Sequence, residues 1–188
     1  LCAALSAKEM GATVAILESA PEDESGGNSR FAGGVMRFAY DSVKDLQKIT
    51  EIPADEVDGV DWESNTKDQF FDDLYHVTSF RTDPNLSEAL VTQSLDTMVW
   101  LRAQGARFVP NYRHQSAVVN GKRKFFGRMP LWAHGGGVGL VTSLTEKAAK
   151  SGIPIFYETR AVSLLYDGER VRGVVAKGQG KPVEYRAR

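Results

Sequence analysis

The pattern of hydrophobic and polar positions at the start of the chain predicts a short helix followed by a strand. Small residues recur through residues 1–10, LCAALSAKEM, and Gly11 ends that segment. Val14 to Leu17 form a continuous apolar run closed by Glu18, as expected of a buried strand. Small side chains let a helix pack closely on a sheet, and we expect Cys2 to be a small buried helix residue.

Residues 41–106 are expected to form a helical excursion from the sheet. Residues 41–66 are polar and acidic with no sustained period, which predicts short helical turns. Thr66 and Gln69 have the spacing of a capping box, and one helical face follows that we expect to be core: Phe70, Phe71, Leu74, Tyr75 and Thr78. A second helix should begin at Asp83-Pro84 and end at Gly105, with an apolar stripe of Leu86, Leu90, Leu95, Met98 and Val99.

From Arg107 onward the pattern changes to strands and loops. The Asn120-Gly121 pair predicts a two-residue hairpin turn. The GGGVG run at 135–139 should open a helix that ends at Gly152, where its free amides would contact an anion or a ring, or where it simply packs closely under another segment. Further strands are expected at 153–157, 161–166, 171–176 and 183–185.

These elements predict an α/β chain. Residues 1–188 read as one domain, a partial doubly wound fold with a helical excursion at about 41–106 and an antiparallel β-meander near its end. A helix of small residues and an acid about 20 residues after a Gly-rich turn are typical of a dinucleotide-binding unit. The small-residue helix in residues 1–10 and the acid Glu18 supply these two features. We therefore expect the first strand and its Gly-rich turn to precede Leu1.

The segment from Gly26 to Gly34, GGNSRFAGG, has four glycines in nine residues. Bare backbone of this kind permits close approach of a ligand, and Asn28 and Ser29 add short polar side chains beside the exposed amides. The same residue types are also common in surface turns, so a plain turn stays open as an interpretation.

Composition narrows the class of protein. The formal net charge of -1 gives no basic field for nucleic acid or anionic lipid. The single cysteine excludes an internal disulfide framework and favours a reducing compartment, from which we expect a cytoplasmic location. No apolar run approaches the roughly 20 residues of a membrane helix.

The run AILESAPEDESGGNSRFAGG resembles the flavoprotein family of fumarate reductases, succinate dehydrogenase flavoprotein subunits and ketosteroid dehydrogenases. The continuation RFAGGVMRFAY and the segments DQFFDDL and RTDPNL are most similar to FAD-dependent tricarballylate dehydrogenases. The resemblance covers essentially the whole chain. It implies an FAD-binding (Rossmann-like) domain, and Ala32 lies where this sequence is one residue shorter than the flavocytochrome c proteins.

The resemblance also implies which residues hold the cofactor. Glu18 would bind the adenosine ribose hydroxyls, and the strand at Ala161 and Val162 would lay its backbone against adenine. The glycine-rich loop would run along the pyrophosphate and the flavin ring, through Gly26, Gly27, Asn28, Ser29, Ala32, Gly33 and Gly34.

The implied reaction is hydride transfer between FAD and a small carboxylate such as tricarballylate, fumarate or succinate, with a separate electron acceptor or donor. The family's acid/base and most carboxylate-clamping residues are expected beyond Arg188, so no catalytic residue is assigned and the piece alone is expected to be inactive. Two alternatives stay open, an NAD-dependent Rossmann oxidoreductase and a non-catalytic nucleotide-binding module.

The histidines give no metal-binding spacing, and no metal site is expected. His76 is expected to be a surface or interhelix side chain. His114 and His134 are candidates for lining a carboxylate-binding cleft.

Overall fold

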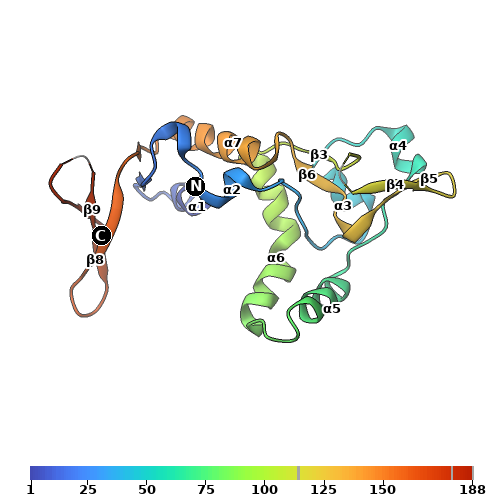
Figure 1. The fold of residues 1–188 in the computed structure, drawn as a ribbon, viewed down its shortest axis with the longest axis horizontal. Helices are drawn as coiled ribbons and strands as arrows, with labels where there is room; N and C mark the ends of the chain where they lie inside the picture. The colour runs from blue at the N-terminus through green and yellow to red at the C-terminus, as the bar shows by residue number, and fades with distance from the viewer. Residues whose placement is uncertain (114, 179, 188) are drawn as a thin grey trace. The chain divides into compact units, whose positions relative to one another are not determined.

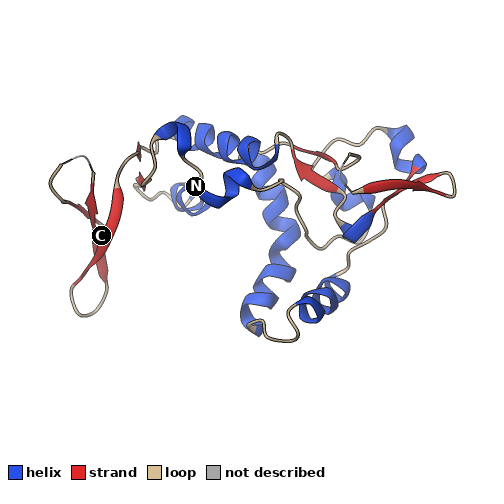
Figure 2. Cartoon of the chain, viewed as in Figure 1, coloured by secondary structure: helices blue, strands red, loops and turns tan. Residues whose placement is uncertain are grey.

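The computed structural model describes residues 1–113, 115–178 and 180–187, and the chain divides into two units (Figures 1 and 2). Unit 1 comprises Leu1–Arg30 and Leu144–Arg188, and unit 2 comprises Phe31–Ser143. Unit 1 is therefore built from the two ends of the chain, and unit 2 is continuous.

Unit 1 begins with the predicted helix and strand. Its elements in this part are α1 (Cys2–Glu9), β1 (Ile16–Leu17), the 3-10 turn η1 (Glu22–Glu24) and α2 (Gly27–Phe31), which runs into unit 2. β1 pairs in parallel with β7 (Ile155–Phe156), with Ile16 opposite Ile155. The ladder is shorter than the predicted strand at Val14–Leu17, and Cys2 is exposed, so the prediction that it is buried was wrong. Leu5 is instead the buried residue of α1.

After α7 (Gly136–Lys150), unit 1 continues into three antiparallel strands. These are β8 (Arg160–Tyr166), β9 (Val171–Lys177) and β10 (Val183–Arg186), with β9 in the centre. The predicted meander is thus confirmed, and the α/β class with it, since the parallel β1–β7 pair and the antiparallel meander occur together with helices. Ala176 of β9 and Leu144, Ala148 and Ile153 are buried.

Unit 2 contains most of the helices. Between residues 43 and 103 the chain forms α3 (Val43–Gln47), α4 (Ala54–Gly59), the short strand β2 (Val60–Asp61), α5 (Lys67–Val77) and α6 (Pro84–Ala103). Figure 1 shows α6 as a long green helix with α5 beside the end where it begins, and the two are in contact. The capping box at Thr66 and Gln69 is confirmed in both directions, and Asp83 caps α6 through its side chain.

The buried face of α6 differs from the predicted stripe. The buried residues are Ser87, Val91, Ser94, Met98 and Leu101, whereas Leu86 and Leu90 are 71% and 52% exposed. The serines can be buried because their hydroxyls are hydrogen-bonded: Ser94 Oγ accepts from the Ala39 amide at 2.9 Å. The prediction was right for Met98 and wrong for Leu86 and Leu90, because it counted only apolar side chains.

The strands of unit 2 form two small sheets. β5 (Lys122–Phe125) lies between β2 and β4 (Ser116–Val119), and the β4–β5 hairpin turns at Asn120 and Gly121, both with positive φ, as predicted. β3 (Phe108–Pro110) pairs with β6 (Leu131–Ala133), and the 3-10 turn η2 (Phe126–Arg128) precedes β6.

The core of unit 2 is aromatic and aliphatic. Phe70 is 5% exposed and packs with Phe71 and Leu74, so the predicted core face of α5 is confirmed for these three. The other deeply buried side chains include Phe38, Tyr40, Leu46, Ile49, Val91 and Leu131. This core supports the segment that leads out of the glycine-rich loop.

Candidate functional site

Glu18 lies directly after β1, at the carboxyl end of a parallel strand. Its Oε1 accepts hydrogen bonds from the Ala20 amide at 2.9 Å and the Ser19 hydroxyl at 3.4 Å. These bonds hold the half-buried carboxylate in a fixed turn at the strand end. Ligands of open α/β sheets bind outside the carboxyl ends of the strands, so Glu18 occupies the position expected of a ribose-binding acid.

The start of β8 is joined to the same turn. The Thr159 amide donates to the Glu18 carbonyl at 2.7 Å, and Arg160 then begins β8. Ala161 pairs with Ala176 and Ser163 with Val175, which leaves Val162 as the extra residue of a β-bulge. A bulged residue does not complete the ladder, so its backbone groups are left for another partner.

The first part of the glycine-rich segment is more ordered than a simple loop. Gly26 and Gly27 have φ of 111° and 52°, and residues 27–31 form α2. Asn28 and Ser29 are exposed on this helical turn, and no atom lies within 4 Å of a β-carbon added at Gly27. The sequence pattern did not reveal this helix, because Gly, Asn and Ser have weak helix propensity.

The second part of the segment packs against the other glycine cluster. A β-carbon added at Gly34 would lie 2.7 Å from the Cα of Gly136, and the φ of Gly34 is 81°. The Ala32 carbonyl accepts from the Gly137 amide at 2.9 Å, and the Gly34 carbonyl accepts from the Ala133 amide at 2.7 Å. The 135–139 cluster therefore serves close packing here, and the Gly137 amide is already used.

Gly33 behaves differently from Gly34. Gly33 is exposed, its φ is not positive, and a β-carbon added to it would meet nothing within 4 Å. The predicted cofactor-binding residues thus fall into two groups, one in each unit. Ala32, Gly33 and Gly34 belong to unit 2, and unit 1 holds the others: Glu18, Gly26, Gly27, Asn28, Ser29, Ala161 and Val162.

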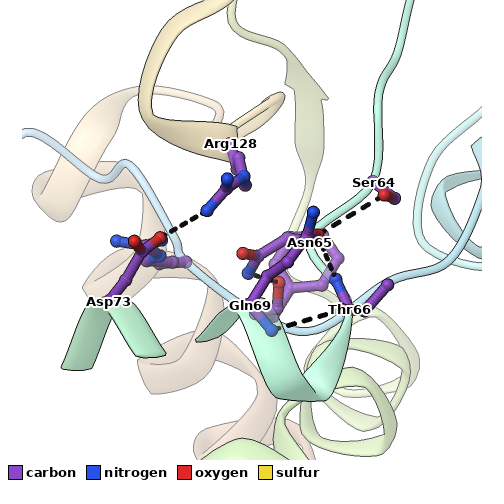
Figure 3. Close-up of polar contacts among 8 residues, drawn as sticks. Ser64, Asn65, Thr66, Gln69, Asp73 and Arg128 are labelled. Carbon is purple, nitrogen blue, oxygen red and sulfur yellow. Dashed lines mark hydrogen bonds and ion pairs between the residues drawn. The ribbon is translucent and has the colours of Figure 1, made fainter. Parts of the chain in front are cut away.

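Sequence reasoning missed a charged cluster in unit 2. Asp73 on α5 faces Arg128, and the distance from Arg128 Nη1 to Asp73 Oδ2 is 2.6 Å (Figure 3). Arg37 Nη2 contacts the same carboxylate oxygen. Figure 3 also shows the neighbouring chain turn where Asn65 and Thr66 lie beside the start of α5. Asn65 Nδ2 donates to the Phe38 carbonyl at 2.7 Å, which fixes the segment that leads to Arg37.

Unit 2 contains two further polar groups, of which Lys124 and Glu63 line the same cavity as this cluster. Lys124 Nζ lies 2.9 Å from Asp61 and 3.6 Å from Glu63, and the hydrogen bond from Lys124 holds the pKa of Asp61 below its ordinary value. Tyr112 donates its hydroxyl proton to Glu56, and its pKa is raised by burial and by this carboxylate, so the phenol stays protonated at neutral pH. No sequence spacing would have paired residues so far apart along the chain.

The structure describes two of the three histidines. His134 is exposed before α7, and its amide donates to the Arg107 carbonyl at 2.9 Å. His114 lies outside the described residues. His76, expected to be a surface side chain, is exposed and lines a cavity together with the Arg37–Asp73–Arg128 cluster.

The described part of the chain contains neither a metal-binding cluster nor a membrane-spanning helix. In residues 1–113, 115–178 and 180–187 no group of three or more His, Cys, Asp and Glu side chains is arranged to hold a metal ion. No helix within these ranges combines the length and the apolar character needed to cross a membrane.

The sequence is similar to that of a known reductase. Over 180 residues the chain is 29% identical to a fumarate reductase (cytochrome) of Shewanella frigidimarina, a match that covers 95% of this chain and 28% of that protein. The chain thus spans less than a third of the length of this curated relative.

Solved structures give the same picture. The open conformation of a flavocytochrome c3 fumarate reductase matches with a TM-score of 0.64 and 26% identity, over 94% of this chain and 28% of that one. The 3-ketosteroid-Δ4-(5α)-dehydrogenase of Rhodococcus jostii RHA1 matches with a TM-score of 0.70 over 98% of this chain and 41% of that one. At 23% identity, this second likeness concerns the fold, and it confirms the predicted α/β fold as that of flavoprotein FAD domains.

A family model described as "FAD binding domain" matches residues 1–188, the whole of the sequence. This agrees with the acid at the carboxyl end of β1 and with the fold of the solved flavoproteins. The chain belongs to the FAD binding domain family.

Proposed function

We propose that this chain is the FAD-binding part of a flavoprotein oxidoreductase of the fumarate reductase and succinate dehydrogenase type. The whole protein would transfer a hydride between FAD and a small carboxylate, and exchange electrons with a separate acceptor or donor. The family match over the whole chain and the 29% identity to a fumarate reductase support this class. Bound FAD supplies the hydride chemistry.

The position of Glu18 carries the proposal. Its carboxylate stands at the carboxyl end of β1 and is held by the Ala20 amide, and its backbone carbonyl is bonded to Thr159 at the entry to β8. A ribose bound by Glu18 would therefore lie near the bulge at Val162, whose backbone can receive an adenine edge. In unit 2, the open space at Gly33 fits a loop that a planar ligand approaches closely.

The test is FAD affinity of the whole protein after Glu18→Ala. A hydrogen bond to a charged group contributes about 1.5–3 kcal/mol, so the dissociation constant should rise roughly 10- to 100-fold. Glu18→Gln removes the charge of the carboxylate but keeps a side-chain oxygen that can accept from the Ala20 amide. This variant therefore tests the ribose contact without disturbing the turn. Glu22→Ala, an exposed acid of η1, is the matched control and should leave the affinity unchanged. An unaltered dissociation constant in Glu18→Ala would remove the main support for the proposal.

Within this class we propose tricarballylate as the substrate, because the segments DQFFDDL and RTDPNL resemble tricarballylate dehydrogenases. Anaerobic bleaching of the flavin absorbance by tricarballylate, with succinate as the comparison, tests this choice. Faster bleaching by succinate would favour a succinate dehydrogenase instead. A cytoplasmic location is proposed on the single cysteine, and fractionation of the producing cells would test it.

A further inference from the structure

A cavity of about 490 Å³ opens in unit 2 beside the charged cluster of α5. Charged side chains of both signs line it, three cations and two acids: Arg37, Lys124, Arg128, Glu63 and Asp73. Its apolar wall includes Val77 and Phe126. Val77 is 74% exposed and Phe126 is 54% exposed. The size is within the range of small-molecule sites, and the combination of fixed cations with an apolar wall is typical of sites for organic anions.

The two arginines share a single counter-charge. Arg128 Nη1 lies 2.6 Å from Asp73 Oδ2 (Figure 3). Arg37 Nη2 contacts the same oxygen. Two guanidinium charges against one carboxylate leave one positive charge in excess. Each guanidinium carries five N–H donors, and the contact with Asp73 takes up only one nitrogen of each among the residues that the structure describes. Another nitrogen, Arg37 Nε, is buried without a hydrogen-bond partner among the described residues.

The orientation of both arginines is set before any ligand arrives. The Arg37 guanidinium lies over the Phe70 ring, with Cζ 5.2 Å from the ring centroid. Arg128 has a φ of 53° and follows Gly127 at 69°, a left-handed conformation that is unfavourable for a non-glycine residue. Backbone strain of this kind persists where the surrounding structure requires the side chain at one place, and it is concentrated at binding sites.

Around Lys124 the negative charges outnumber the positive one. Lys124 lies near two acids, Asp61 at 2.9 Å and Glu63 at 3.6 Å, so its charge is already compensated. An anion is therefore attracted to the arginine side alone. A planar carboxylate matches the donor fork of a guanidinium, and the apolar wall at Phe126 would cover a short carbon skeleton.

We propose that Arg37 and Arg128 form a binding site for the carboxylate of a small organic acid, which takes the guanidinium donors that Asp73 leaves unused. Arg37 follows Gly34 by three residues in one continuous segment. The choice of tricarballylate as the probe rests on the proposed function, whereas the site itself rests on the cavity and its charges.

The test is calorimetric titration of the whole holoprotein with tricarballylate. Arg128→Gln should weaken binding roughly 10- to 100-fold, the effect of losing charge-assisted hydrogen bonds, and Arg128→Lys should restore part of the affinity. Arg123→Gln is the matched control, since Arg123 lies on β5, the strand that precedes the turn carrying Arg128, and stacks over Tyr112 instead of lining the cavity. It should leave the affinity within about twofold. Binding to Arg128→Gln that equals wild type overturns the proposal.

A second variant tests the site without changing the Arg37–Asp73–Arg128 cluster, whose ion pairs could also stabilise the fold. Phe126 is exposed, so Phe126→Glu should fold normally and supply its own carboxylate to the arginines, which abolishes tricarballylate binding. Unchanged binding to this variant also overturns the site. Steady-state kinetics show whether the bound carboxylate belongs to the substrate or to a separate effector. A raised KM in Arg128→Gln identifies it as the substrate. An unchanged KM, together with the loss of one tricarballylate per protein in the calorimetric titration, identifies it as an effector.

Flavin content distinguishes the two proposals. Holoprotein that retains FAD but binds tricarballylate independently of Arg128 contradicts the carboxylate site and leaves the flavoprotein function intact. Protein without FAD that still binds tricarballylate through Arg128 contradicts the function and supports the site.

Discussion

Replacing Gly34 by alanine should destabilise the protein, whereas replacing its neighbour Gly33 should not, although both belong to the same glycine-rich motif. At Gly34 an alanine β-carbon would lie 2.7 Å from the Gly136 Cα, and the φ of 81° is unfavourable for any side chain. The left-handed conformation costs about 1–2 kcal/mol and the overpacking about 1–3 kcal/mol, so Gly34→Ala should destabilise unit 2 by about 2–5 kcal/mol. Gly33→Ala meets no atom within 4 Å and should change stability by about 0.5 kcal/mol or less.

Hydrogen exchange of the whole protein measures this difference locally. The Gly137 amide donates to the Ala32 carbonyl and the Ala133 amide to the Gly34 carbonyl, so these two amides report the contact between the glycine clusters. They should exchange at least tenfold faster in Gly34→Ala and at the wild-type rate in Gly33→Ala. Equal exchange in both variants would refute the close-packing argument.

A variant at Gly33 distinguishes the effect of packing from the effect of cofactor binding. Gly33→Val places a branched side chain where the protein leaves open space, so it should fold normally and yet lose flavin if the cofactor approaches there. Purified Gly33→Val with full flavin content would show that Gly33 is only part of a turn.

Two other predictions concern the stability of unit 2, through Ser94 in α6 and through Asp45 in α3. Ser94→Ala leaves the buried Ala39 amide without its acceptor and should lower the free energy of unfolding in urea by about 1–3 kcal/mol. Thr92→Ala in the same helix removes only a solvent-exposed hydrogen bond and should cost less than about 0.5 kcal/mol; similar losses in the two variants would contradict this. Lys48 donates to Asp45 at 2.7 Å and lowers the pKa of that carboxyl, so its stabilisation is present above about pH 4 and is lost as the pH falls further. Asp45→Asn should therefore show a shallower loss of stability in acid, and a pH profile parallel to wild type would count against the ion pair.

Local signals in the sequence predicted most of the fold. The capping box at Thr66, the proline after Asp83 and the Asn120-Gly121 turn each act through backbone groups within a few residues, so their sequence pattern determines their structure. The buried face of α6 was predicted correctly at Met98 but not at Ser94, because burial of Ser94 depends on the Ala39 amide, which lies in a different segment.

The candidate site was predictable only in part, for the same reason. The strand-end position of Glu18 follows from a local apolar run, and the structure has the acid there. The contact between Gly34 and Gly136, and the Arg37–Asp73–Arg128 cluster, join positions that are distant in sequence. No periodicity or motif identifies such partners, because neither side chain chemistry nor spacing indicates which distant segment will fold beside it.

The pairing of β1 with β7 has a consequence for biosynthesis. Ile16 finds its partner only when Ile155 has left the ribosome, and the whole of unit 2 is made in between. At roughly 5–20 residues per second, β1 waits about 7–30 s without its parallel neighbour. Unit 2 is continuous and can form first during this interval, while the apolar run at Ile16 and Leu17 remains a target for chaperones. A translational pause placed within unit 2 would lengthen this exposure and should lower the yield of folded protein.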